Sequence, residues 1–229
     1  MGKRRLIGKI VILMLGLAAV VILAANGGTI PVSTPKKGYR VVIDPGHGGS
    51  DCGAVGVSGV KEAGLNLAVS LYLKEELEAL GMEAILTRSD ERALAEGKKA
   101  DMAARGKIMN GEGVDLVVSV HMNKFTDPSV HGPMAFYMKG SAEGEKLAKT
   151  VIDSITDELG APRRIANPGD YYVIRESMPV SVLVECGFLS NSGDEELLQQ
   201  EQHQKKLAHA IARGIFSYFE GDLGRKPLD

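Results

Sequence analysis

The chain has 229 residues, of which 44% are hydrophobic and 24% are charged. This balance suits one domain with a sizeable core and excludes a disordered chain. The formal net charge is −2, and because four of the 27 basic residues lie within the first nine positions, the rest of the chain is acidic on balance. With no Trp, few aromatic residues and an acidic balance beyond the first nine positions, the chain is not expected to bind nucleic acid.

The first 25 residues combine a short basic head with an apolar run from Ile10 to Ala25. This pattern is typical of a secretory signal peptide or of a signal anchor. Extended back to Leu6, the run approaches the roughly 20 residues that cross a bilayer, and the nearest cleavage-type site, Ala25-Asn26-Gly27, is weak. Both features favour a single-pass anchor in the cell membrane over a cleaved signal, which would leave a secreted protein. The basic head predicts that the rest of the chain lies outside the cytoplasm.

The anchor is followed by a segment, residues 26–38, that holds Gly, Ser, Thr and Pro without an apolar period. This composition predicts a linker. We expect one folded domain at 39–220 and a polar tail at 221–229.

The domain opens on a β-branched strand, Arg40 to Ile43, that stops at the turn DPGHGG. The turn leaves His47 between glycines at the C-terminal end of the strand, where open α/β sheets bind ligands. Small neighbours leave both ring nitrogens accessible, which suits a metal ligand. A glycine-rich turn after a strand is equally compatible with phosphate binding.

Strand-like apolar runs alternate with helical spacing along the rest of the domain. The expected helices are 65–80, 92–110, 143–159 and 195–220, and the expected strands are 82–87, 114–120, 131–138 and 180–184, with a short strand or turn at 171–174. This alternation predicts an α/β fold, a three-layer sandwich with a largely parallel central sheet and helices on both faces.

Three of the strands deliver a residue that can bind a metal or move a proton, namely His47, His121 and Glu185. Glu62, between the first strand and its helix, emerges at the same edge. Two neutral imidazoles and one carboxylate form a ligand set for catalytic zinc, and the remaining carboxylate is then free for acid/base chemistry. Structural explanations exist too, since Glu62 can stabilise a helix N-terminus and His121 can be a core histidine. Four such residues at one sheet edge favour a functional site.

Five segments resemble, in order and approximate spacing, the zinc-dependent N-acetylmuramoyl-L-alanine amidases of the amidase-3 type: VVIDPGHGG (41–49), KEAGLNLAVSLYL (61–73), LTRSD (86–90), SVHMN (119–123) and VLVECGFLSN (182–191). The resemblance makes 39–220 a catalytic domain. It implies one Zn²⁺ per chain, bound by His47, Glu62 and His121, with Glu185 as the catalytic acid/base. It also implies hydrolysis of the amide bond between N-acetylmuramic acid and L-alanine in the substrate, peptidoglycan.

The segment between His121 and Tyr171 is short, whereas division-associated relatives carry a longer insertion there with a helix that blocks the zinc. We also expect no separate wall-binding repeat. A compact amidase on one N-terminal anchor resembles the spore-cortex amidases of endospore-forming bacteria, which remove stem peptides on the way to muramic lactam. The membrane is an expected partner through the N-terminal helix, and an activating protein partner is compatible with this architecture.

Four further residues near the proposed ligands are candidates for the substrate or for ligand orientation. Ser119 and Asn123 can orient ligands or substrate, or they can satisfy backbone groups at a strand end. Asp44 can accept a hydrogen bond behind the ligands, or it can serve the turn alone. Arg105, together with Arg88, is a candidate for contact with an acidic stem peptide.

Two other functions compete with the amidase. One is a catalytically silent module that binds peptidoglycan, and the other is a zinc peptidase that cuts within the stem peptide. The presence of all four proposed site residues disfavours the silent module. Reaction products separate the peptidase, because only an amidase leaves muramic acid without attached alanine.

Cys52 and Cys186 are the only cysteines. They lack the CxxC spacing of redox or zinc motifs. We interpret them as small thiols packed near the cleft, in preference to a disulfide.

Overall fold

The structure is a computed structural model that describes residues 38–162 and 165–221. The predicted signal anchor, the linker up to residue 37 and the tail from residue 222 lie outside these ranges. Among the described residues, no helix is long and apolar enough to span a membrane. The anchor and the orientation that it implies stay predictions.

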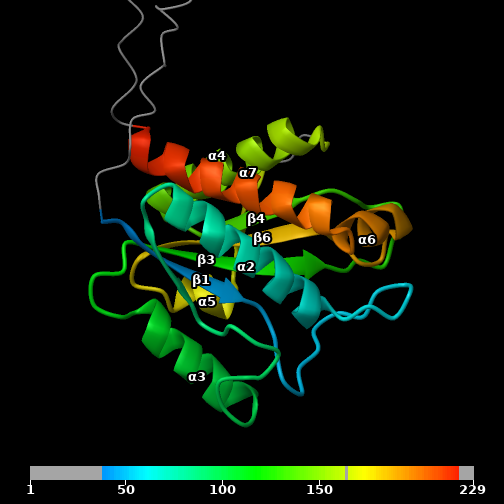
Figure 1. Cartoon of the computed structure of the whole chain (residues 1–229), viewed down its shortest axis with the longest axis horizontal. Coiled ribbons are helices and arrows are strands. Elements are labelled where there is room, and N and C mark those ends of the chain that lie inside the picture. The colour runs from blue at the N-terminus through cyan, green and yellow to red at the C-terminus, as the bar shows by residue number, and fades with distance from the viewer. Residues whose placement is uncertain (1–37, 163–164, 222–229) are drawn as a thin grey trace, which may run out of the picture. The chain divides into compact units, whose positions relative to one another are not determined.

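The centre of the fold is a six-stranded sheet in the order β2-β1-β3-β6-β4-β5 (Figure 1). Its strands are β1 (Arg40–Pro45), β2 (Glu83–Leu86), β3 (Leu116–Asn123), β4 (Met134–Met138), β5 (Ala166–Gly169) and β6 (Val180–Phe188). Only the pairing of β4 with β6 is antiparallel within this sheet. The sheet is therefore largely parallel, as predicted.

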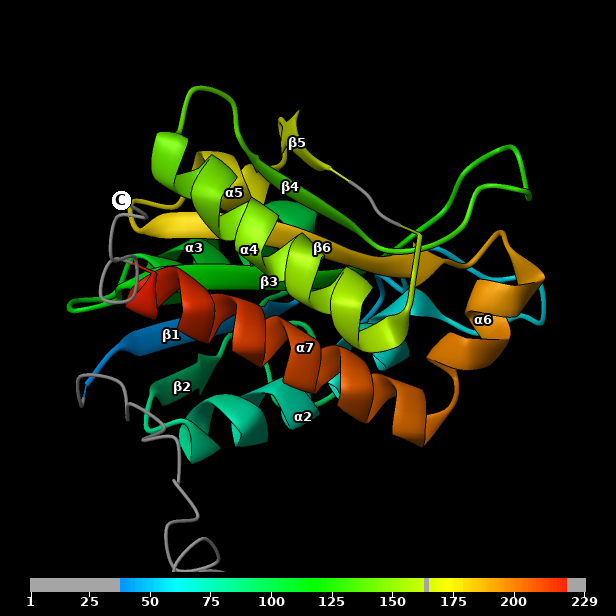
Figure 2. The same ribbon diagram turned by 90° about the horizontal axis from the view of Figure 1, so that it is seen from above.

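Helices cover both faces of the sheet (Figure 2). One face carries α2 (Glu62–Ala79), α4 (Ala142–Leu159) and α7 (Glu201–Glu220), and the opposite face carries α3 (Lys98–Met109) and the short α5 (Tyr172–Arg175). Helix α6 (Ser192–Leu198) follows β6 and precedes α7. These three layers confirm the predicted sandwich.

Strand β1 shows why both faces are covered. Side chains alternate along a strand, so Val41 and Ile43 pack into the core beneath α2, α4 and α7, whereas Val42 packs into the smaller core beneath α3 and α5. All three side chains are fully buried. A strand that is apolar on both sides is stable only inside a layered fold.

Helix α2 begins earlier than the predicted helix at 65–80. Its buried apolar residues recur at every fourth position from Leu65 to Leu77, which makes one stripe against the sheet. The helix starts at Glu62, so this carboxylate lies in its first turn rather than before it.

The helix predicted at 92–110 forms only from Lys98 onward. Gly97 has a φ of +83°, which ends the helical backbone on its N-terminal side. Asp101 accepts a hydrogen bond from the Leu94 amide at 2.7 Å, so residues 92–97 form a loop folded against the first turn of α3. The alanine residues of this segment recur at helical spacing, so the sequence predicts a helix where the structure has a loop.

The sequence prediction was also wrong in the second half of the domain. Residues 172–175 form the short helix α5 instead of a strand or a simple turn. Strand β5 was not expected, because the sequence Ala-Asn-Pro-Gly lacks β-branched residues, and it pairs only with β4 at the sheet edge. The helix expected at 195–220 is two helices, α6 and α7, separated at Gln199 and Gln200.

Candidate active site at the carboxyl edge of the sheet

The candidate site lies at the C-terminal ends of β1, β3 and β6, on the face that α3 and α5 cover. Strand alternation puts His121 and Glu185 on this face, because their neighbours Val120 and Val184 pack into the opposite core. Strands β3 and β6 are parallel, and His121 and Glu185 are direct partners in their register. Two residues from distant segments are thereby brought side by side.

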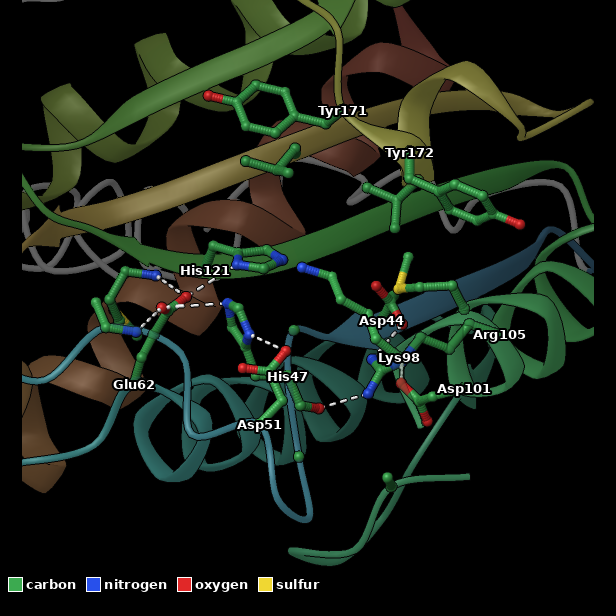
Figure 3. A pocket seen from close by; sticks show the side chains of 18 of the residues that line it. Asp44, His47, Asp51, Glu62, Lys98, Asp101, Arg105, His121, Tyr171 and Tyr172 are labelled. Atoms are coloured by element: carbon green, nitrogen blue, oxygen red, sulfur yellow. Dashed lines mark hydrogen bonds and ion pairs between the residues drawn. The ribbon is translucent and has the colours of Figure 1, made fainter. Parts of the chain in front are cut away.

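His47, Glu62 and His121 come together at this edge (Figure 3). His47 lies two residues after the end of β1, Glu62 is the first residue of α2, and His121 lies in β3. Glu62 Oε2 is 3.2 Å from His47 Nε2, and Glu62 Oε1 is 2.9 Å from His121 Nδ1. One ligand atom from each residue lies within 4.8 Å of the other two.

This set of donors fits a divalent metal. Burial by itself raises the pKa of Glu62, but hydrogen bonds with His121 and His47 outweigh burial and hold the pKa well below its usual range. The carboxylate is therefore ionised, as a ligand has to be. Two imidazole nitrogens and one carboxylate oxygen, close enough to share one ion, match a catalytic zinc site with an open fourth position.

Neighbouring groups fix the orientation of the proposed ligands. Asp51 Oδ2 lies 2.9 Å from His47 Nδ1, which leaves Nε2 of the same ring to face Glu62. Glu62 accepts hydrogen bonds from Ala54 N at 2.7 Å and from Asn66 Nδ2 at 3.1 Å. Sequence reasoning did not single out Asp51 or Asn66, although each follows a proposed ligand by four positions.

Two glycines make room for the ligand side chains. A Cβ atom at Gly46 would lie 2.2 Å from His121 Cε1, and a Cβ atom at Gly53 would lie 2.5 Å from Glu62 Oε2. Gly53 also has a φ of +67°, in the left-handed region. The glycines thus permit close approach of the second histidine and of the carboxylate, whereas the sequence suggested only an open approach to the first histidine.

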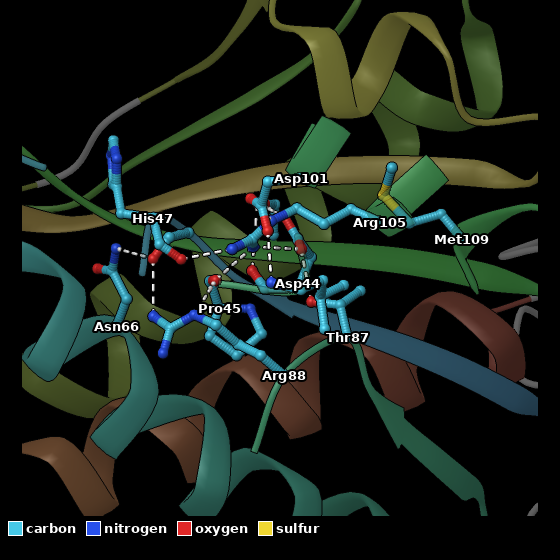
Figure 4. A network of polar contacts seen from close by, with 12 residues as sticks. Asp44, Pro45, His47, Asn66, Thr87, Arg88, Asp101, Arg105 and Met109 are labelled. Atoms are coloured by element: carbon cyan, nitrogen blue, oxygen red, sulfur yellow. Dashed lines mark hydrogen bonds and ion pairs between the residues drawn. The ribbon is translucent and has the colours of Figure 1, made fainter. Parts of the chain in front are cut away.

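Asp44 is the centre of a buried polar network behind the glycine-rich turn (Figure 4). It is 1% exposed and accepts hydrogen bonds from Thr87 Oγ1 at 2.7 Å, Arg105 Nη1 at 2.9 Å and Ser119 Oγ at 2.9 Å. Burial alone raises the pKa of Asp44, but the Arg105 charge and the Thr87 hydrogen bond bring it below its ordinary value. The Ser119 hydroxyl, a candidate for orienting ligands or substrate, is thus bonded to the Asp44 side chain in this network.

Both arginines of this network bind carbonyl groups around the turn. Arg105 donates to Pro45 O at 2.7 Å, and Arg88 donates to Gly46 O and to Ala63 O, both at 2.8 Å. Ala63 lies in the first turn of α2, so Arg88 joins the turn that carries the first histidine to the helix that carries the carboxylate. The two side chains are 1% and 4% exposed, and their hydrogen bonds go to the protein itself.

Glu185 is buried beside the proposed ligands, and its Oε2 atom has no hydrogen-bond partner within the described part of the chain. Burial raises the pKa of its carboxyl group to about 7, although the charge on His121 opposes the rise. A carboxyl group that titrates near neutral pH and keeps one oxygen free can accept and return a proton. This environment suits general acid/base catalysis.

A pocket of about 580 Å³ opens over the proposed ligands and Glu185. Its walls are the turn at 46–51, the start of α3 with the loop before it, the end of β3, and the residues Tyr171 to Val173. Asn123 lines the pocket while its Oδ1 accepts a hydrogen bond from Lys124 N at 2.8 Å. The volume is in the usual range for ligand sites, large enough for one junction of a polymer.

Both cysteines are free thiols, and Cys186 is buried in the opposite core.

A buried carboxylate of α6 holds the loop at residues 50–61 against the domain. Glu195 is 4% exposed and accepts hydrogen bonds from Ser58 N at 2.9 Å and from Ser58 Oγ at 3.0 Å. Gly56 packs so closely that a Cβ atom there would lie 2.0 Å from Glu195 Oε1. The same loop supplies the Ala54 amide that bonds the Glu62 carboxylate, so the loop connects Glu195 to the proposed metal site.

Replacing Glu195 with Ala is expected to weaken zinc affinity about tenfold, because outer groups that orient ligands typically contribute that much. Competition with a chromophoric chelator measures the affinity. Glu196→Ala is the matched control, because its side chain is exposed on the same helix. Unchanged affinity in folded Glu195→Ala protein would show that the loop is held by other contacts.

The family model Amidase_3, described as N-acetylmuramoyl-L-alanine amidase, matches residues 41–217. This chain belongs to the amidase-3 family. Two Bacillus subtilis relatives align with most of the amidase. The uncharacterized protein YqiI is 36% identical over 189 residues, covering 81% of this chain and 87% of the relative. The germination-specific N-acetylmuramoyl-L-alanine amidase is 33% identical over 203 residues, covering 85% of each chain.

Solved structures agree with this assignment. The CwlD amidase of Clostridioides difficile, in complex with the GerS lipoprotein, matches the amidase with a TM-score of 0.76 and 32% identity, over 80% of this chain and all of that one. The catalytic domain of CwlV from Bacillus (Paenibacillus) polymyxa matches with a TM-score of 0.72 and 32% identity, over 80% and 98% of the two chains. The predicted amidase activity on peptidoglycan is thereby confirmed.

Proposed function

We propose that the amidase binds one zinc ion through His47, Glu62 and His121, and that Glu185 is its catalytic acid/base. The observation that carries the assignment is the register between β3 and β6, which sets Glu185, with its free buried oxygen, next to a proposed metal ligand. Glu62 is the ligand of the two glutamates because both histidines contact its carboxylate.

In the proposed reaction, polarisation of the reacting groups is assigned to the metal and proton transfer to the protein. A bound zinc ion supplies Lewis acidity toward the lactyl carbonyl and toward the attacking water. Glu185 accepts the proton of that water while the new C–O bond forms, and it returns the proton to the L-alanine nitrogen as the C–N bond breaks. The products are a glycan with a free lactyl carboxylate and a stem peptide with a free N-terminal amine.

We further propose that the amidase acts outside the cytoplasm on the spore cortex, held to the cell membrane by its N-terminal 25 residues. The germination-specific relative and the likeness to CwlD support the spore role. The CwlD structure contains GerS, which supports a protein partner for this amidase as well. The hydrophobic N-terminal run supports the anchor.

Removing the metal tests the zinc assignment. The full chain, purified in detergent, is expected to contain one zinc ion by mass spectrometry of the metal, and a chelator is expected to lower activity at least about 100-fold, since the ion supplies several kcal/mol of transition-state stabilisation. Added Zn²⁺ should restore it. Full activity without metal would refute the zinc site.

Product analysis separates the competing functions. Digested peptidoglycan should yield muramic acid without alanine and stem peptides that begin with L-alanine. Cleavage only within the stem peptide would identify a peptidase. Protein that sediments with peptidoglycan but releases no peptide, even when loaded with zinc, would be a silent binding module.

A further inference from the structure

Lys98 is a cation in the same pocket as the proposed catalytic centre. It is the first residue of α3, and its side chain is among those that surround the pocket (Figure 3). Burial raises the pKa of Asp51, but the hydrogen bond with His47 at 2.9 Å, together with smaller contributions of which the Lys98 charge is one, outweighs burial. Within the described ranges no hydrogen bond or ion pair engages the Lys98 ammonium group. It is therefore available to a ligand.

The other cations that line this pocket are already engaged. Arg105 is 1% exposed and makes hydrogen bonds to Asp44, Asp101 and two turn carbonyls. Lys124 Nζ donates to Val55 O at 2.8 Å. Arg105, one of the residues expected to contact an acidic stem peptide, thus serves the turn, and the pocket offers Lys98 for that purpose instead.

Apolar side chains line the pocket together with Lys98. Met102 follows Lys98 by four positions and shares its helix face, and both line the pocket. Leu183 precedes Glu185 by two positions in β6, on the same face of the sheet, and Val173 packs beside it. The pocket therefore presents apolar side chains and a cation together with the proposed catalytic carboxyl group.

The apolar side chains and the ammonium group of this pocket match the peptide side of the substrate. The glycan offers hydroxyl and acetamido groups and carries no charge next to the cleaved bond. The stem peptide begins with the methyl group of L-alanine, and an acidic residue follows. The apolar side chains suit the methyl group, and the ammonium group of Lys98 suits the carboxylate.

We propose that Lys98 binds a carboxylate of the stem peptide, so that the part of the pocket between α3 and α5 is the stem-peptide subsite. The inference rests on the proposed amidase function and adds to it a specificity residue. We assign Lys98 to substrate binding and not to the chemical step, because Glu185 and the proposed metal ligands already supply the groups that the step needs.

The test uses two muramyl dipeptides that differ in one group, N-acetylmuramyl-L-alanyl-D-glutamate and its carboxamide counterpart. For the zinc-loaded full chain, Lys98→Gln should raise KM for the carboxylate substrate about tenfold, the usual effect of losing a hydrogen bond to a charged group. The variant's kcat should stay within about twofold, and its KM for the carboxamide should not change. Lys99→Gln, exposed and outside the pocket, is the matched control.

A second readout does not depend on turnover. Titration calorimetry with the product-like dipeptide L-alanyl-D-glutamate should show binding to the wild type that Lys98→Gln weakens by a similar factor. Equal effects of Lys98→Gln on both substrates, or no effect on dipeptide binding, would overturn the subsite. Failure of the wild type to release stem peptides from whole peptidoglycan would refute the catalytic assignment, and dipeptide binding would still decide the role of Lys98.

Discussion

Glu185→Gln is expected to lose about 10³-fold in kcat while keeping one zinc ion per chain, because the amide side chain cannot carry the proton between water and leaving amine. Single-turnover release of stem peptide measures the loss, and metal analysis measures the zinc content. Glu62→Gln is the paired variant, and it should lose the zinc. If zinc leaves Glu185→Gln and stays in Glu62→Gln, the roles of the two glutamates are reversed.

The unfolding temperature of Glu185→Gln shows whether this variant is correctly folded. Burial raises the pKa of Glu185 to about 7 in the metal-free protein, above the value of an unfolded chain. Its ionisation therefore lowers stability as pH rises from about 4 to above 7. Because Gln has no charge to bury, metal-free Glu185→Gln should unfold at pH 8 at a temperature no lower than the wild type. A lower unfolding temperature would mean that lost activity reflects lost structure.

The largest effect on stability is expected for Arg105→Met. This change leaves the Asp44 carboxylate buried without its cation, which typically lowers the free energy of unfolding by about 3 to 5 kcal/mol. Urea denaturation at pH 7 measures the difference. Arg92→Met is the control, since the Arg92 side chain is 87% exposed. A small change in Arg105→Met would mean that Thr87 and Ser119 alone satisfy Asp44.

The effect of Arg105→Met should also depend on pH in a defined direction. In the wild type the pKa of Asp44 is below its ordinary value, so the contribution of this group is present at neutral pH and is lost as pH falls through that lowered pKa. Without Arg105, burial is opposed less and the pKa of Asp44 rises. The stability difference between variant and wild type should therefore shrink below about pH 4.

Much of the site was predictable because its residues lie at or near the C-terminal ends of parallel strands. Apolar runs identify β1, β3 and β6 as buried parallel strands, and parallel strands deliver their terminal residues to one edge. This rule predicts from the sequence alone that His47, His121 and Glu185 lie close together. The division of roles between Glu62 and Glu185 came from the family resemblance, since residue types alone left either carboxylate free to bind metal.

What could not be predicted depends on contacts between distant segments. The sequence predicts contact of Arg88 and Arg105 with an acidic substrate, but packing turns both side chains toward backbone carbonyls. The loop at 92–97 has helical spacing, and the positive φ of Gly97 together with the hydrogen bond to Asp101 removes it from α3. The positive φ of His47 has no sequence signal either, because non-glycine residues seldom adopt it.

The hydrogen bonds of Arg88 affect how the enzyme would bind its proposed metal ion. By tying the turn and α2 together through main-chain carbonyls, this side chain preorganises two of the three proposed ligands. Zinc fingers fold only when the ion arrives, because their ligands are not assembled beforehand. Here the arrangement of the proposed ligands belongs to the protein fold, so we expect the supply of metal to switch catalysis on or off without a folding transition.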